Sequence, residues 1–350
     1  MNTVRVVVVG CGNMGSSHAR AYAHLQGFEL VGLVDRSMQK AEPLSKELGS
    51  IPLYSSFEEA IAAAHPDAAA ICTYPETHHD LAMKSLGAGM HVFVEKPLAV
   101  TVAQAEEIAR ASQNARKKAV VGYILRHHPA WQRFIEEARL LGKPLVMRMN
   151  LNQQSSGKEW EVHKSLMHSM SPIVDCGVHY VDVMCQMTRS RPVRVQAIGA
   201  RLTEEISESM YNYGHLHVVF DDGSLGWYEA GWGPMMSETA YFVKDVIGPK
   251  GCVSIAEPRA EKTGGSSDID SHTKTSSLIK HDAASMKNTT INTSDEPDHQ
   301  ELCNREQAYF LRAIREDLDL REHLDDAINS LRIVLAADLS VRTGNVVQLP

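Results

Sequence analysis

Hydrophobic positions in the first third of the chain come in short runs rich in valine, each followed by a helix-length stretch of mixed polarity. Runs that are apolar at nearly every position indicate strands buried on both faces, and helical crossovers between them are typical of a parallel sheet. Ser56 with Glu59 and Thr101 with Gln104 have the capping-box spacing, which predicts that helices begin there. The predicted strands are 4–9, 29–35, 67–73, 91–97 and 119–124.

After about residue 125 the pattern changes to longer strands, which favour a mostly antiparallel sheet with helices on one face. The turns DDGS and GPKG join neighbouring strands as in hairpins. Residues 258–300 are rich in Ser, Thr, Lys and Asp with little periodicity, and we expect a long surface excursion there. The predicted strands are 144–152, 192–202, 215–220, 225–232 and 239–248, and the predicted helices are 129–141, 170–188, 303–316 and 323–343.

The composition is that of a globular protein with a net negative charge. The 350 residues exceed what one hydrophobic core usually serves and predict two domains. A formal charge of −8, from 35 basic and 43 acidic residues, excludes a sequence-wide basic surface for nucleic acid or anionic membrane, so the expected partner is a small molecule or another protein. The cysteines form no CxxC pair and no apolar run reaches about 18 residues, so we expect no disulfide, no membrane span and a cytoplasmic location.

A glycine motif follows the first predicted strand. Gly10, Gly12 and Gly15 have GxGxxG spacing at the mouth of a helix, where they permit a tight turn, a close approach of backbone to a pyrophosphate, and close packing of helix on sheet. Asp35 ends the next strand twenty residues beyond Gly15, where a carboxylate can bind a ribose 2′-hydroxyl. The charge of Asp35 favours NAD over NADP, although Arg36 beside it could pair with a 2′-phosphate.

The stretch SPIVDCGVHYVDVM, residues 171–184, places three ionisable side chains in an apolar helix. Asp175, His179 and Asp182 share one helical face because their spacings are four and three residues. A metal site, an acid/base pair and a hydrogen-bonded core network all fit this pattern. Metal is the least favoured of the three, because the stretch lacks the thiolates or additional imidazoles typical of zinc sites.

The segment TYPETHHDLAMKSLGAGMHVFVEKPLA, with GCGNMG, GYILRHHPAW and DCGVHYVD, resembles the Gfo/Idh/MocA family of sugar and cyclitol oxidoreductases over nearly the whole chain except 258–300. The resemblance implies an N-terminal Rossmann domain over 1–124 that binds NAD(P). It also implies a C-terminal α+β domain over 125–350, whose open, mostly antiparallel sheet serves oligomerisation. The activity it implies is NAD(P)-dependent oxidation of a secondary ring hydroxyl of a cyclitol, sugar or glycoside. Met170, Ser171 and Pro172 stand where many members have glycines.

The resemblance also assigns roles to residues. His179 matches the base that removes the hydroxyl proton, while Lys96 and Asp175 match the lysine and aspartate that hold the alcohol. The chemistry agrees, because histidine accepts protons near neutral pH and a lysine at the carboxyl end of a parallel strand can stabilise an alkoxide. The resemblance further implies a cis Lys96–Pro97 bond. The expected cofactor-binding residues are Gly10, Gly12, Asn13, Met14, Gly15, Asp35, Arg36, Thr73, Tyr74, Pro75, His78, Glu95 and Lys96; the expected substrate-binding residues are Tyr123, Arg126, Trp160, Asp175 and His179; no metal ligand is expected.

Other functions remain open at this point. Transient oxidation by bound NAD would allow elimination or epimerisation of a glycoside without net NADH. A nucleotide-binding regulatory protein would keep the fold without chemistry, but Lys96, Asp175 and His179 argue against it. A metal-dependent hydrolase would lose its activity in chelator.

The helices predicted in the C-terminal half can cover only one of the two faces of the predicted sheet. Val195, Ala197, Val218 and Phe220 alternate along two of its strands, and we expect them on the uncovered face. Packing of two such faces would bury them, and a two-fold arrangement is the commonest way to close the contact. We therefore expect a homodimer, or a homotetramer built from two dimers.

Overall fold

The computed structural model describes residues 3–238, 240, 242–256, 266, 273–293 and 296–350. The chain forms two compact units, Met1–Ile124 with Asp298–Ile328 and Leu125–Pro297 with Asn329–Pro350. This division differs from the expected domains of 1–124 and 125–350, because the segment 298–328 belongs to the first unit. The physical reason is that Phe310 and Leu311 are buried in the hydrophobic core of that unit.

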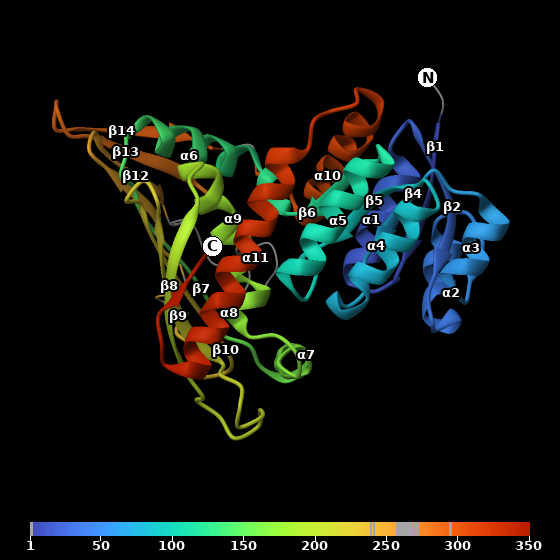
Figure 1. Cartoon of the computed structure of the whole chain (residues 1–350), viewed down its shortest axis with the longest axis horizontal. Helices are drawn as coiled ribbons and strands as arrows, with labels where there is room; N and C mark the ends of the chain where they lie inside the picture. Colours follow the sequence, from blue (N-terminus) through green and yellow to red (C-terminus); the bar gives the residue numbers. More distant parts are fainter. Residues whose placement is uncertain (1–2, 239, 241, 257–265, 267–272, 294–295) are drawn as a thin grey trace. The chain divides into compact units, whose positions relative to one another are not determined.

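The first unit contains a six-stranded sheet with the order β3-β2-β1-β4-β5-β6, in which all neighbouring strands are parallel (Figure 1). The order reverses between β1 and β4, and folds of this kind bind ligands beyond the carboxyl ends of the strands at that point. The predicted parallel sheet is confirmed, and β3 adds a short edge strand. The strands are β1 (Val4–Val9), β2 (Phe28–Val34), β3 (Leu53–Tyr54), β4 (Ala68–Ile71), β5 (His91–Glu95) and β6 (Ala119–Gly122).

Helices connect these strands, and two of them begin at the predicted caps. The backbone N–H of Glu59 donates to Ser56 Oγ, and that of Gln104 donates to Thr101 Oγ1, each at 3.2 Å. The helix α10 (His299–Arg315) packs against α1 and brings Phe310 beside Phe93 of β5. The other helices of the unit are α1 (Asn13–His24), α2 (Met38–Glu47), α3 (Phe57–Ala64), η1 (Pro75–Thr77), α4 (His78–Gly87) and α5 (Val102–Ala115).

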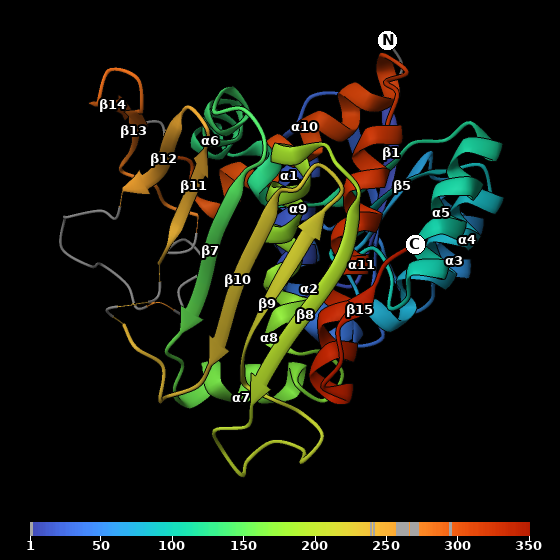
Figure 2. The same cartoon turned by 60° about the vertical axis from the view of Figure 1, so that its left-hand side comes forward.

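The second unit contains a nine-stranded sheet with the order β14-β13-β12-β11-β7-β10-β9-β8-β15. Figure 2 shows β7, β10, β9 and β8 side by side. β10 pairs with β7 in parallel, and the other pairs are antiparallel, which confirms the predicted mostly antiparallel sheet. The strands are β7 (Val146–Gln153), β8 (Pro192–Ala200), β9 (Tyr213–Phe220), β10 (Leu225–Trp232), β11 (Lys244–Gly248), β12 (Gly251–Ala256), β13 (Ser277–Asp282), β14 (Lys287–Asn292) and β15 (Val347–Gln348).

Part of the segment expected to be a surface excursion is a hairpin. β13 and β14 pair in register from Ser277 with Asn292 to Asp282 with Lys287, and β13 extends the sheet from β12. Polar residues with little hydrophobic periodicity can form such a hairpin because an edge pair needs backbone hydrogen bonds more than buried side chains. Residues 258–265 and 267–272 of the expected excursion lie outside the described residues.

Helices cover one face of the second sheet. α8 (Pro172–Asp175) and α9 (Gly177–Thr188) pack on β9, β10 and β7. Val195, Ala197, Val218 and Phe220 are all buried, so the expectation that they lie on an uncovered face is wrong. The four residues do share one face, because Val195 pairs with Val218 and the others follow at a period of two, but this is the face on which the helices pack. The remaining helices are η2 (Ile124–His127), α6 (Pro129–Leu140), α7 (Gly157–Leu166) and α11 (Arg321–Thr343). Of these, α11 contributes residues to both units.

The opposite face of the second sheet, called the open face below, carries the intervening residues. Strand register places Ile198 beside His215, and Leu225 and Ile247 on either side of Val146. Several large apolar side chains are exposed there by 37% to 61%: Val146, Ile198, Leu225, Ile247 and Ile279. Among the described residues, no helix has the length and apolarity needed to cross a membrane.

Candidate active site

The glycine turn between β1 and α1 has the geometry that a dinucleotide needs. Gly10 has a φ of +90°, and a Cβ there would lie 2.6 Å from the carbonyl oxygen of Cys72. A Cβ on Gly15 would lie 1.8 Å from the carbonyl oxygen of Gly10, so helix and turn are in direct backbone contact. Gly12, the N-cap of α1, has nothing within 4 Å of its Cβ position. Two glycines are therefore required by the fold, and the third leaves space in front of the helix N-terminus.

The first residues of α1 border this space. Asn13 is exposed and Met14 is half-buried, and both belong to the first turn of the helix. The N–H groups of a first helical turn have no partner within the helix and favour an anion. The residues at this turn thus fit the diphosphate of NAD.

Asp35 follows β2 and is fixed to the glycine turn. Its Oδ2 accepts a hydrogen bond from the N–H of Cys11 at 2.8 Å, and its Oδ1 accepts one from the N–H of Ser37 at 2.8 Å. The carboxylate thus stands beside the pyrophosphate turn, as the ribose-binding role requires. Arg36 is exposed next to it.

The loop after β4 presents the next group of expected cofactor residues. Thr73 is half-buried with its Oγ1 hydrogen-bonded to Thr77 Oγ1 at 2.7 Å, Tyr74 is exposed, and Pro75 is buried at the start of η1. β4 lies next to β1 in the sheet, so this loop and the glycine turn flank the same switch point. Thr73 and Tyr74 remain accessible to a ligand there.

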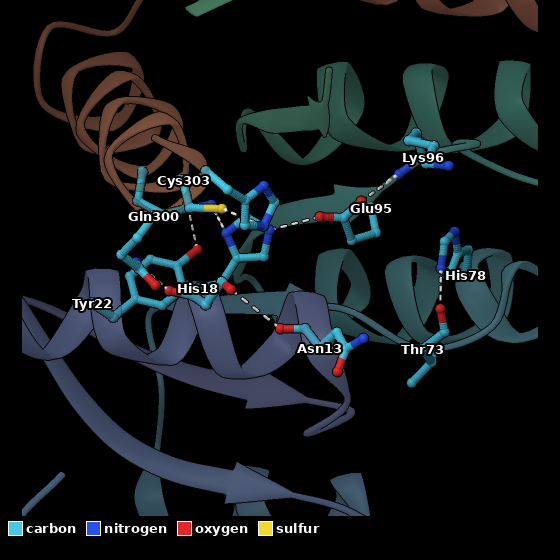
Figure 3. A network of polar contacts seen from close by, with 12 residues as sticks. Asn13, His18, Tyr22, Thr73, His78, Glu95, Lys96, Gln300 and Cys303 are labelled. Atoms are coloured by element: carbon cyan, nitrogen blue, oxygen red, sulfur yellow. Dashed lines mark hydrogen bonds and ion pairs between the residues drawn. The ribbon is translucent and has the colours of Figure 1, made fainter. Parts of the chain in front are cut away.

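His78 is placed differently from the expectation that it contacts the cofactor. Its ring is fully buried, with Nδ1 2.8 Å from the carbonyl oxygen of Pro97 and Nε2 3.0 Å from that of Thr73 (Figure 3). Burial lowers the pKa of His78 below its ordinary value, despite both carbonyl contacts. A neutral imidazole has one N–H and donates to one of these two carbonyls, so the buried ring lies between the loop after β4 and the loop after β5 and has no accessible nitrogen for a cofactor.

Glu95 and Lys96 lie at the carboxyl end of β5, and the Lys96–Pro97 bond is cis, as the resemblance implied. Glu95 is buried and Lys96 is half-buried. The N–H of Lys96 donates to Glu95 Oε2 at 3.1 Å, and His18 Nε2 lies 2.6 Å from Glu95 Oε1. Burial by itself raises the pKa of Glu95, but the hydrogen bond from His18 and the charge and N–H of Lys96 outweigh it, so the pKa lies below its ordinary value.

The helical stretch of the second unit exposes two of its three ionisable residues. From 170 to 185 every residue is buried except Asp175 and His179, which are half-buried. They lie four positions apart, one at the end of α8 and one in the first turn of α9. Ser171 caps α8 and also donates to Asp338 Oδ1 at 2.7 Å, which anchors the start of the stretch. An acid/base pair is therefore displayed on an otherwise buried helix.

Asp182 has a separate, structural role. It is buried, and its carboxylate accepts two hydrogen bonds from Arg126, from Nε at 2.8 Å and from Nη2 at 2.5 Å. Gln186 Nε2 donates to it as well, at 2.9 Å. Arg126, which was expected to bind substrate, is thus committed to a buried ion pair with 8% of its side chain exposed. Of the three interpretations given for this helical face, the core network is the one that the contacts of Asp182 support.

Two further expected substrate residues are buried. Tyr123 is fully buried after β6, and Trp160 of α7 is 5% exposed with its Nε1 donating to Glu205 Oε2 at 3.3 Å. Both side chains belong to the packing of their units.

A cluster beside Asp175 joins Trp232, an aromatic residue that the sequence offered as a possible lining of a sugar pocket, to His163 and Gln153, which no sequence motif indicated. The His163 ring stacks on Trp232 with centroids 4.4 Å apart, and Trp232 Nε1 donates to Gln153 Oε1 at 2.8 Å. Cys176 Sγ donates to the same oxygen at 3.4 Å. Burial lowers the pKa of His163 to about 4, and the charge of Asp175 opposes this shift. His163 lies on α7, a helix whose only buried residue is Trp160. The hydrophobic periodicity of this helix is weak, so the sequence pattern did not indicate that His163 belongs to a cluster.

One group in the first unit has metal-ligand chemistry. Potential ligand atoms of His18, Cys303 and Glu306 lie within 4.8 Å of one another, and this is the one such group among the described residues. However, both ring nitrogens of His18 already have protein partners, Glu95 and Gln307. A metal would have to displace one of them.

Residues 4–123 match the family model described as "Oxidoreductase family, NAD-binding Rossmann fold", and residues 132–253 match the "GFO/IDH/MocA C-terminal domain". The chain is 28% identical to the scyllo-inositol 2-dehydrogenase (NAD(+)) of Bacillus subtilis over 272 residues, covering 73% of this chain and 75% of that protein. It is 26% identical to the D-glucoside 3-dehydrogenase of Escherichia coli over 51% of this chain and 52% of the relative. Several other relatives are likewise matched over little more than half of their length, such as 58% for a UDP-N-acetylglucosamine 3-dehydrogenase from Acidithiobacillus ferrooxidans.

Solved structures share the fold over the full chain. The myo-inositol 2-dehydrogenase from Lactobacillus plantarum aligns with a TM-score of 0.80 and 19% identity over 100% of both chains. An oxidoreductase from Agrobacterium radiobacter, in complex with NAD+, L-tartaric acid and magnesium, aligns with a TM-score of 0.81 and 14% identity over 99% of this chain and 98% of that one. With both of its domains matched, this chain belongs to the Gfo/Idh/MocA family of oxidoreductases and has that family's NAD-binding Rossmann domain.

Proposed function

We propose that this protein is an NAD-dependent dehydrogenase that oxidises a secondary ring hydroxyl of a cyclitol, sugar or glycoside. The observation that carries the proposal is the pair Asp175 and His179, the only half-buried positions in the stretch 170–185. Relatives named as inositol, glucoside and UDP-N-acetylglucosamine dehydrogenases support the substrate class.

The proposed catalytic residues are Lys96, Asp175 and His179. His179 takes the hydroxyl proton, because a neutral imidazole is a base suited to neutral pH. Lys96 donates to the oxygen as its negative charge develops, and Asp175 favours the protonated form of His179 by its charge. Bound NAD supplies the hydride acceptor. The glycine turn, Asp35 and the loop at Thr73 would hold this cofactor.

A substrate panel tests the proposal. Scyllo-inositol, myo-inositol, methyl glucosides, free hexoses and UDP-N-acetylglucosamine are each incubated with NAD, and the absorbance of the reduced cofactor is followed. We expect sustained NADH formation with at least one ring polyol or glycoside, unchanged by chelator. Consumption of a glycoside without net NADH would instead support transient oxidation. No turnover of any compound would refute the proposal.

We further propose a homodimer, or a tetramer of two dimers, formed through the open face. The support is the set of exposed aliphatic side chains there, with Ile198 61% and Leu225 45% exposed, on a sheet whose other face is covered. A two-fold contact would pair this face with itself.

We also propose a cytoplasmic location. All six cysteines are free, which supports it.

A further inference from the structure

A buried polar network joins α1, β5 and α10 within the first unit, and none of the roles above uses it. His18 and Tyr22, one turn apart on α1, face α10, where Gln307 lies between them (Figure 3 shows His18, Tyr22 and Glu95). His18 and Gln307 are fully buried, Tyr22 is 1% exposed and Glu95 is 5% exposed. A network this deep costs free energy unless each polar atom has a partner.

The hydrogen bonds run in one direction through these side chains. Tyr22 Oη donates to Gln307 Oε1 at 2.5 Å, which leaves Gln307 Nε2 to donate to His18 Nδ1 at 2.9 Å. With Nδ1 as the acceptor, the imidazole carries its proton on Nε2 and donates it to Glu95 Oε1 at 2.6 Å. The other Glu95 oxygen accepts the N–H of Lys96. The chain of contacts therefore ends at the backbone of the lysine.

We propose that His18 is a positioning residue that holds Glu95 in place, and through Glu95 fixes Lys96 for the chemical step. This inference rests on the role proposed above for Lys96. The side-chain hydrogen bonds of the imidazole are those with Glu95 and Gln307 described above. It acts by supplying one N–H at one place, the Oε1 atom of a buried carboxylate.

The need for His18 follows from the burial of Glu95. A buried carboxylate without a donor takes up a proton, and its hold on the Lys96 N–H then weakens. The contact with His18 is among the causes that keep the pKa of Glu95 below its ordinary value, with the charge of Lys96 as a further cause. The carboxylate and the ammonium attract each other, so losing the His18 contact also changes the charge beside Lys96. Titratable groups that act on this site come from α1, α4, α10 and the positions directly after β4 and β5: Tyr22, His78, Cys303, Glu306, Cys72 and Lys96.

The matched variants are His18→Gln and His18→Asn. The amide nitrogen of glutamine reaches the place of Nε2 and can donate to Glu95, whereas that of asparagine reaches only the place of Nδ1. Arg20→Ala is the control, because Arg20 lies on the same helix in a largely exposed ion pair with Glu47. The readouts are kcat and KM across pH with the compound that the panel shows to be oxidised fastest, and NAD affinity by protein fluorescence.

We expect His18→Asn to lower kcat on the order of 10- to 100-fold, since a misplaced catalytic group costs about that much. The pH range over which this variant keeps a high kcat should be narrower than that of the wild type. Without the His18 contact the pKa of Glu95 rises, so Glu95 is already protonated at a higher pH, and Lys96 then lacks the negative charge beside it. His18→Gln should retain kcat within about fivefold and keep the wild-type profile. NAD affinity should stay within about threefold in all variants, and Arg20→Ala should match the wild type. Equal kcat and equal profiles in the two His18 variants would overturn the proposal.

A second measurement needs no substrate. Imidazole ¹⁵N shifts of the wild type should show the proton of the His18 ring on Nε2, and Glu95→Gln should move the Nε2 signal. An Nδ1-protonated His18 would overturn the proposed direction of the network, and stoichiometric zinc in the purified protein would replace it by a metal site with Cys303 and Glu306. If the panel shows no turnover, the proposed function fails on its own, and a His18 ring protonated on Nδ1 is then the result that decides against the network.

Discussion

Two substitutions in the glycine turn can distinguish a glycine that the fold needs for stability from a glycine that NAD binding needs. We compare Gly12→Ala with Gly15→Ala. The first Cβ would meet nothing within 4 Å, and the second would lie 1.8 Å from the carbonyl oxygen of Gly10. Gly12 has a φ of −71°, which alanine adopts without strain. We therefore expect Gly12→Ala to fold and to lose NAD, and Gly15→Ala to lose stability.

The magnitudes follow from these contacts. Alanine is a poorer N-cap than glycine, so Gly12→Ala should cost about 1 kcal/mol or less of unfolding free energy. Gly15→Ala forces helix and turn apart and should cost about 3 kcal/mol or more. For a unit of this size that lowers Tm by roughly 6–12 °C. A methyl group in front of the helix N-terminus should weaken NAD binding about 100-fold, because the diphosphate must approach the backbone there.

Thermal unfolding with and without NAD measures both effects. At an NAD concentration of 100 times the wild-type Kd, the wild type gains about 2.7 kcal/mol, whereas a variant that binds 100-fold more weakly gains only about 0.4 kcal/mol. Gly12→Ala should thus unfold near the wild-type temperature without NAD and respond little to it. A full NAD response in Gly12→Ala, or a Gly15→Ala protein as stable as the wild type, would refute this division of roles.

Four further outcomes are expected. His179→Ala and Lys96→Ala should each lower kcat about 100-fold with NAD affinity nearly intact, because both residues act on the chemical step. Steady-state kinetics and NAD titration measure the two quantities, and near-normal turnover in either variant would show that the residue is not catalytic. Asp35→Ser should admit NADP, and a wild type that already prefers NADP would contradict the role of Asp35. Asp182→Ala leaves a buried guanidinium unpaired and should cost about 3–5 kcal/mol in denaturant unfolding, where a loss below about 1 kcal/mol would show that the pair is not needed. Ile198→Glu places a charge on the open face and should give a mass near 38.6 kDa by light scattering, whereas the wild type gives a multiple of that mass. A monomeric wild type would refute the proposed dimer.

The candidate site was partly predictable because its motifs are local. Gly10 and Gly15 have distinct steric roles that GxGxxG spacing already implies, and Asp35 reaches the turn through one short crossover. Spacing also placed Asp175 and His179 on one helical face. The same spacing grouped Asp182 with them, since periodicity says which residues share a face and nothing about what stands opposite.

Sequence alone predicted the parallel and the mostly antiparallel sheet, the helix starts at Ser56 and Thr101, and the glycine turn, because the pattern that indicates each of them is local. Only the tertiary structure decided the partners that come from far away, such as Asp182 for Arg126, 56 residues apart, and Gln307 for His18, 289 residues apart. It also decided which face of the second sheet is covered. The alternation along a strand predicts which side chains share a face, and only the tertiary structure shows which of the two faces the helices pack on.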